Sequence, residues 1–204
     1  MLEFLLLFPF FMIAVVVHEV SHGVVALSLG DPTALRAGRL TLNPFRHIDL
    51  FGTILLPVVL VVLKAPFLFG WAKAVPVDSR FLRNPKRDML WVGAAGPVSS
   101  LLMAAAGALI FRAFGSAFSG LLSVLAGYFV MVNLFLGIFN LLPIPPLDGS
   151  RLLTSLLPAK MAGVMILLER WGFLILMLLV YSGATSWIMT PVIERLAGLL
   201  LGAR

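Results

Sequence analysis

The chain has 204 residues, of which 61% are hydrophobic and only 12% are charged, and its mean hydropathy is +1.08. So few polar side chains cannot cover a folded surface, which excludes a soluble globular protein and predicts an integral membrane protein. The formal charge of +6 does not indicate nucleic-acid binding, because the basic residues lie in short segments between apolar runs and form no aromatic-studded face. With no cysteine in the chain, His, Asp and Glu remain as candidate metal ligands.

The apolar runs predict an all-α polytopic membrane protein with about four full transmembrane helices. Each of these four runs is about as long as the roughly 20 helical residues that a hydrocarbon core requires, and they span about residues 3–29, 90–111, 121–139 and 161–181. The run 51–69 is shorter and is interrupted by prolines and a lysine. We expect a short membrane-associated β element at about 70–77 and a C-terminal amphipathic helix at 186–201.

No internal repeat or separate soluble region divides the chain. We therefore expect residues 1–204 to form a single membrane-embedded domain, with a core at about 3–157 and C-terminal helices at 158–204.

The first apolar run contains the motif His18-Glu19-Val20-Ser21-His22. On a helix, residues four apart share a face, so both imidazoles can reach one metal ion while Glu19 lies beside them. Catalytic zinc usually takes three protein ligands, and Asp148 is the best third candidate. It directly follows a proline-rich stretch where the helix 121–139 must unwind.

This pairing constrains the topology. The histidines lie toward the C-terminal part of one helix, and Asp148 lies just beyond the C-terminal end of another. The two helices should therefore run parallel. Two helices run parallel only if the chain crosses the membrane an even number of times from the end of the first to the end of the second. The spans 90–111 and 121–139 supply two crossings. The run 51–69 is therefore expected to be re-entrant, which means that it enters the membrane and returns on the same side. Most basic residues then share one side, against Arg112, Arg195 and Arg204 on the other, which places the site toward the cytoplasm.

Three motifs together resemble the site-2 protease family of intramembrane zinc metalloproteases, in its short form without a PDZ domain. They are His18-Glu19-x-x-His22, Ala95-Gly96-Pro97 and Asn140-x-x-Pro143-x-Pro145-x-Leu147-Asp148-Gly149. Other segments are similar to the bacterial and archaeal short branch, which implies a prokaryotic cell membrane: Asn43-Pro44, His47-Ile48-Asp49, Gly52-Thr53 and Phe69 to Lys73. The resemblance covers about residues 10–155. Two departures are Ala74 and Ser100, which stand where proline and asparagine are usual.

The resemblance implies cleavage of peptide bonds in or near the transmembrane segments of membrane-protein substrates, with one Zn²⁺ per chain. His18, His22 and Asp148 would hold the metal, and Glu19 would act as the general base toward water activated by zinc. Asn140 looks like the family's asparagine before the proline-rich turn. It either binds the substrate backbone or the developing oxyanion, or it caps the unwound helix end.

Two other classes of protein stay open at this point. A metal-binding membrane transporter would need polar residues along a path across the bilayer, and the last spans offer almost none. A catalytically silent membrane scaffold would have no reason to keep Glu19 between the ligands. His47, the remaining histidine, is expected to be structural in the interfacial loop, with a regulatory ligand that fills the open zinc position as the alternative.

Overall fold

The computed structural model describes residues 2–64, 70–114 and 120–202, and its regular elements are helices. They are α1 (Leu2–Ser28), α2 (Thr33–Arg36), α3 (Leu56–Val62), α4 (Pro85–Phe114), α5 (Leu121–Asn140), α6 (Asp148–Leu156), α7 (Ala162–Tyr181) and α8 (Ala184–Leu201). Short 3-10 turns lie at Pro44–His47, Ser79–Phe81 and Ala159–Met161, and a π-helical turn at Leu50–Leu55 precedes α3.

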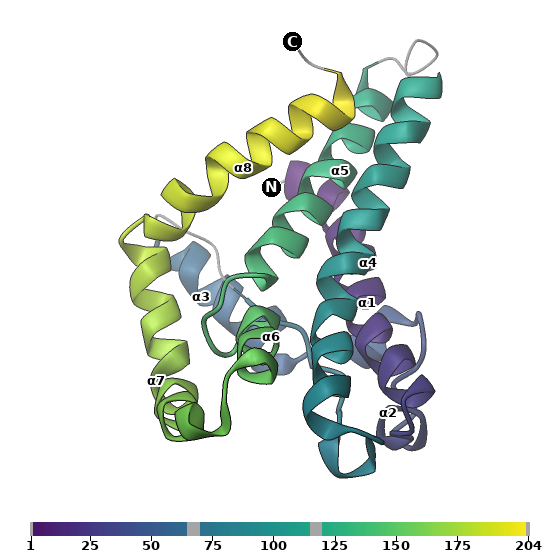
Figure 1. Cartoon of the computed structure of the whole chain (residues 1–204). Helices are drawn as coiled ribbons and strands as arrows, with labels where there is room; N and C mark the ends of the chain where they lie inside the picture. The colour runs from purple at the N-terminus through teal and green to yellow at the C-terminus, as the bar shows by residue number, and fades with distance from the viewer. Residues whose placement is uncertain (1, 65–69, 115–119, 203–204) are drawn as a thin grey trace.

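The centre of the molecule is the bundle of α1, α4 and α5. In Figure 1 α1 and α5 run downward along the chain while α4 runs upward, so α1 and α5 run in the same direction, as the sequence predicted. Three segments of described helix are long and apolar enough to cross a membrane: Leu7–Ser28, Pro85–Phe114 and Leu121–Asn140. The fold is therefore an all-helical multi-pass membrane architecture.

The predicted fourth full span is only partly supported. Residues Leu168–Tyr181 of α7 and the whole of α8 qualify together, as a pair bent by 71°, so the described chain has three spans, or four if this pair counts as one. Met189, Ile193 and Ala197 share a face of α8 and are buried. Ala197 packs in a cluster with residues of α4 and α5, which are Ala104, Ala108, Val130 and Leu134. The small alanine side chains at 104, 108 and 197 let these helices approach closely in a lipid environment.

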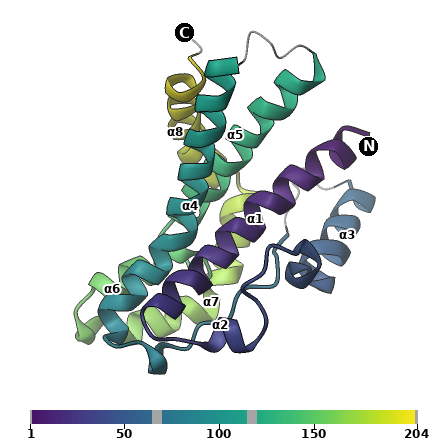
Figure 2. The same ribbon diagram turned by 90° about the vertical axis from the view of Figure 1, so that its right-hand side faces the viewer.

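The run 51–69 was expected to re-enter the membrane without crossing it. The apolar helical stretch Leu50–Val62 is about 20 Å long at 1.5 Å per residue, which is less than the roughly 30 Å of a hydrocarbon core. Both views place α3 at the periphery of the central bundle (Figures 1 and 2). Residues 65–69 lie outside the described part of the chain.

The β element expected at 70–77 is not confirmed: residues 70–78 carry no regular secondary structure. Their backbone N–H groups bond to loops and side chains in place of a neighbouring strand. Trp71 N–H donates to the Gly52 carbonyl (3.2 Å) and Lys73 N–H to the His47 carbonyl (2.8 Å). Without a second strand, the chain alone cannot form a ladder. We call residues 70–78 the docking segment.

Candidate active site

His18 and His22 lie on one face of α1, four residues apart, and each side chain is almost fully buried. Asp148 is the first residue of α6, which begins directly after the proline-rich turn that ends at Leu147. Its Oδ2 atom lies 3.1 Å from Nε2 of His18 and 3.1 Å from Nε2 of His22. The structure thus brings together the three side chains that the sequence singled out.

The other nitrogen of each imidazole is held by α4. Nδ1 of His22 lies 2.7 Å from the carbonyl oxygen of Val92, and Nδ1 of His18 lies 3.0 Å from Oγ of Ser100. A carbonyl can only accept, so Nδ1 of His22 carries the hydrogen and Nε2 of the neutral ring presents a lone pair. That lone pair faces a carboxylate oxygen, and two such atoms repel each other unless a cation lies between them.

The donor set fits a zinc ion. Ligand atoms about 2.0–2.1 Å from a tetrahedral metal lie about 3.3 Å apart, close to the 3.1 Å observed between Asp148 and each histidine. A carboxylate and two neutral imidazoles are the forms in which these three side chains bind a metal ion.

Two glycines allow the backbone to approach this cluster closely. A Cβ atom at Gly96 of α4 would overlap the Nε2 atoms of both histidines. A Cβ atom at Gly149 would overlap the carbonyl oxygens of Leu141 and Leu142 in the preceding turn. Gly96 thus lets α4 cover the ligands, and Gly149 lets α6 begin directly behind the turn.

Glu19 is half-buried beside the ligands on α1. Its Oε2 atom accepts a hydrogen bond from the backbone N–H of Val75 in the docking segment, at 2.8 Å. Gly23, one turn further along α1, makes room for this contact, because a Cβ atom there would overlap the side chains of Val75 and Leu40. The carboxylate is therefore fixed between the histidine pair and the docking segment.

The docking segment is itself held by two buried charged side chains. Nη2 of Arg39 donates to the carbonyl oxygens of Lys73 (2.5 Å) and Ala74 (3.4 Å). Oδ2 of Asp31 accepts from the backbone N–H of Asp78 at 2.7 Å. Both side chains are more than nine-tenths buried. In the sequence they stand in a polar connection where a solvated role is the ordinary interpretation, so only the contacts reveal this function.

Asn140 and His47 lie outside the three-residue cluster of potential metal ligands. Asn140 is the last residue of α5, and its Nδ2 atom donates to the Leu136 carbonyl at 3.0 Å. His47 is fully buried, and its Nε2 atom is 2.9 Å from the Thr41 carbonyl. Ser100, which the sequence marked only as a departure from a family pattern, touches His18. Ser100 follows Gly96 by four residues on the same helix, and this spacing could have shown that the two residues share the face that covers the histidines.

These features define a membrane-embedded metallohydrolase with a His-Glu-x-x-His helix. The profile of "Peptidase family M50" matches residues 113–179. The "Putative zinc metalloprotease YwhC" of Bacillus subtilis is 38% identical over 199 residues, which cover 92% of this chain and 87% of that protein. A protein with the same description, Rip2 of Mycolicibacterium smegmatis, is 29% identical over 193 residues, covering 90% of this chain and 69% of Rip2. No solved structure matches the chain significantly.

The chain belongs to peptidase family M50, the site-2 proteases. It is an intramembrane zinc metalloprotease, and Zn²⁺ is its metal cofactor. The sequence prediction of family, activity and metal is thereby confirmed.

Proposed function

We propose that this protease hydrolyses peptide bonds in or near the transmembrane segments of membrane-protein substrates, with His18, His22 and Asp148 as its zinc ligands. The observation that carries the assignment is the convergence of three buried donor atoms within 4.8 Å of one another, while Glu19 on the same helix is not one of them. Three protein ligands leave the fourth position of a tetrahedral ion for chemistry.

When bound, zinc polarises the scissile carbonyl and lowers the pKa of water to about 7. Glu19 is the general base: its carboxylate takes a proton from the attacking water and passes it to the nitrogen of the leaving amine. The hydrogen bond from Val75 N–H holds one oxygen of this carboxylate and orients the other. Burial of the ligands excludes bulk water and strengthens each electrostatic interaction at the site.

The substrate is proposed to add to the docking segment as an extended strand. The N–H groups of Trp71, Lys73 and Val75, which are two residues apart, all bond within the protein. In an extended chain, the intervening residues 72 and 74 present their backbone N–H groups to the opposite side. Main-chain pairing there would form the β element that the chain lacks alone, and it would keep the unwound substrate beside Glu19.

Asn140 is proposed to contribute its second amide hydrogen to the substrate backbone or the oxyanion. One hydrogen of Nδ2 is used by the Leu136 carbonyl, and an amide has two. A donor aimed at the oxyanion contributes about 3 kcal/mol in comparable sites.

The active site is proposed to open toward the cytoplasm. The end of the molecule that carries α2, α6 and the start of α4 (Figure 1) also carries exposed basic residues, among them Arg36, Arg83, Lys86 and Arg87. Lys and Arg concentrate in cytoplasmic loops. This orientation requires Leu50–Val62 to return to the side from which it entered, and residues 1–204 then act as one domain in a prokaryotic cell membrane.

The test replaces Glu19 with Gln in the purified protein, with Glu169→Gln as the matched control, since Glu169 is an exposed residue of α7. We expect Glu19→Gln to retain stoichiometric zinc while cleavage of a reporter transmembrane substrate falls at least 1,000-fold, on the order of what removing an essential proton-transfer group costs. Removing zinc with a chelator should stop cleavage by the wild type and the control alike. Undiminished cleavage by Glu19→Gln would refute the assignment of the base.

A further inference from the structure

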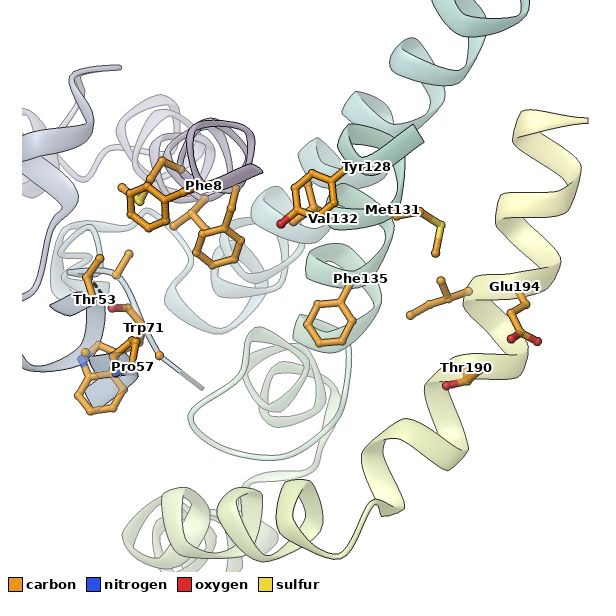
Figure 3. Close-up of a pocket in the computed structure, with 17 residues that line it drawn as sticks. Phe8, Thr53, Pro57, Trp71, Tyr128, Met131, Val132, Phe135, Thr190 and Glu194 are labelled. Atoms are coloured by element: carbon orange, nitrogen blue, oxygen red, sulfur yellow. Dashed lines mark hydrogen bonds between the residues drawn. The ribbon is translucent and has the colours of Figure 1, made fainter. Parts of the chain in front are cut away.

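A cavity of about 610 Å³ lies beside the proposed active site. Figure 3 shows its walls: Phe8, Thr53 and Trp71 lie on one side, with α5 in the middle and α8 on the other side. Its lining is overwhelmingly apolar. Gly70, Trp71 and Ala72 belong to both the cavity wall and the docking segment, so a substrate paired with that segment would extend directly into the cavity.

The cavity lies at membrane depth. Its lining residues on α5 lie near Met131, in the middle of the helix, ten residues after its start and nine before its end. On α1 it is lined by Met12 and Val15, which precede His18 by six and three residues. The cavity is thus the continuation of the active site toward the middle of the bilayer.

One acidic side chain lies at the edge of this apolar wall, where it is exposed. Glu194, in the middle of α8, is the one charged residue among the cavity's described lining residues. None of the ion pairs within residues 2–64, 70–114 and 120–202 includes it, and its neighbour Arg195 is not among the lining residues. An ionisable group at membrane depth costs free energy, so such a group usually faces a cavity or a partner group that it binds.

We propose that this cavity is a substrate subsite in which Glu194 recognises a cationic side chain, Lys or Arg, in the transmembrane segment of the substrate. The inference rests on the proposed function, because it assumes that a substrate occupies the docking segment. The apolar walls take the flanking aliphatic side chains, and the carboxylate of Glu194 supplies the charge that a Lys or Arg buried in lipid requires.

The depth of the cavity along α5 gives a window for the position of the basic residue. Met131 is nine residues from Asn140 at the active-site end of α5, which corresponds to about 13 Å along the helix. An extended substrate covers that distance in about four residues and a helical one in about nine. The recognised side chain is therefore expected between these two positions, counted from the cleaved bond into the membrane.

The probe is a set of synthetic transmembrane peptides of about 20 apolar residues, in which a single Leu is replaced by Lys at successive positions, with Gln as the uncharged polar control. Binding is measured with the zinc-loaded Glu19→Gln protein in lipid vesicles by fluorescence quenching, and cleavage is measured with the otherwise wild-type protein. Glu194→Gln and Glu194→Lys are compared with Glu169→Gln.

We expect Lys at one or two positions in the predicted window to improve binding and kcat/KM at least tenfold over Gln at the same position. Glu194→Gln should bring this ratio to about one, and Glu194→Lys should transfer the preference to a substrate with Asp at that position. Glu169→Gln should keep the wild-type ratio. An unchanged Lys preference in Glu194→Gln, or no preference in the wild type, overturns the inference. Binding is measured in the Glu19→Gln protein and does not depend on cleavage. If cleavage fails while binding shows the expected Lys preference, the result counts against the proposed catalytic roles and supports the subsite.

Discussion

Replacing Gly96 with alanine places a methyl group against the two imidazoles of the candidate metal site. The new Cβ atom would lie 2.5 Å from Nε2 of His18 and closer still to Nε2 of His22, whereas ordinary contacts of a Cβ atom begin at 3.4 Å. Neither imidazole can yield freely, because Val92 and Ser100 hold their Nδ1 atoms. Helix α4 or the ligands must therefore move by about 1 Å.

A displacement of this size exceeds what a metal site tolerates, since ligand distances must stay within about 0.2 Å of their preferred values. We expect Gly96→Ala to lose most of its bound zinc, and kcat/KM for a reporter transmembrane substrate to fall by about 100-fold or more. Zinc content is measured by elemental analysis of purified protein, and cleavage is followed on the same samples.

The matched control is Gly127→Ala, because a Cβ atom at Gly127 of α5 meets nothing within 4 Å. In a helix interior this change stabilises by about 1 kcal/mol, so Gly127→Ala should fold, bind zinc and cleave like the wild type. If Gly96→Ala retained full zinc and full activity, Nε2 of the two histidines would not face the metal as we infer.

Two further substitutions test how the surrounding side chains support the site. Ser100→Ala removes the partner of His18 Nδ1 and should weaken zinc affinity by about 10- to 100-fold, as measured by competition with a zinc indicator; an unchanged affinity would contradict an orienting role for Ser100. Arg39→Ala frees the carbonyls of Lys73 and Ala74 and should raise KM about tenfold or more at unchanged zinc content, since loss of a charged hydrogen bond costs about 1.5–3 kcal/mol. Arg39→Lys, which keeps one cationic donor, should recover part of that loss, and equal KM values in all three proteins would contradict a positioning role.

The helices and the convergence of His18, His22 and Asp148 could be predicted from the sequence because both depend on short-range patterns. Apolar runs of membrane-spanning length gave α1, α4 and α5 within a few residues of their observed ends. The spacing of His18 and His22 fixes their shared face, and the proline turn before Asp148 requires an unwound helix end. Together, the shared face of the histidines and the unwound helix end before Asp148 predicted that α1 and α5 run parallel.

The parts that the sequence did not predict depend on contacts between segments far apart in the chain. The expected β element failed because a strand needs a partner, and the N–H groups of the docking segment instead bond to Gly52, His47 and Glu19. The sequence separated the segments 161–181 and 186–201, but the 71° bend between α7 and α8, near Gly183 with its left-handed conformation (φ 76°), has no signal in hydropathy.

The docking segment connects the proposed substrate cavity with Glu19, the proposed general base. Its first residues line the cavity, Lys73 and Ala74 are held by Arg39, and Val75 fixes the carboxylate of Glu19, the proposed general base. A displacement of the segment would therefore reach both the proposed substrate site and the proposed base, whereas His18 and His22 are held separately by α4. Loss of Arg39 should thus affect substrate handling without removing zinc, and loss of Ser100 should do the reverse.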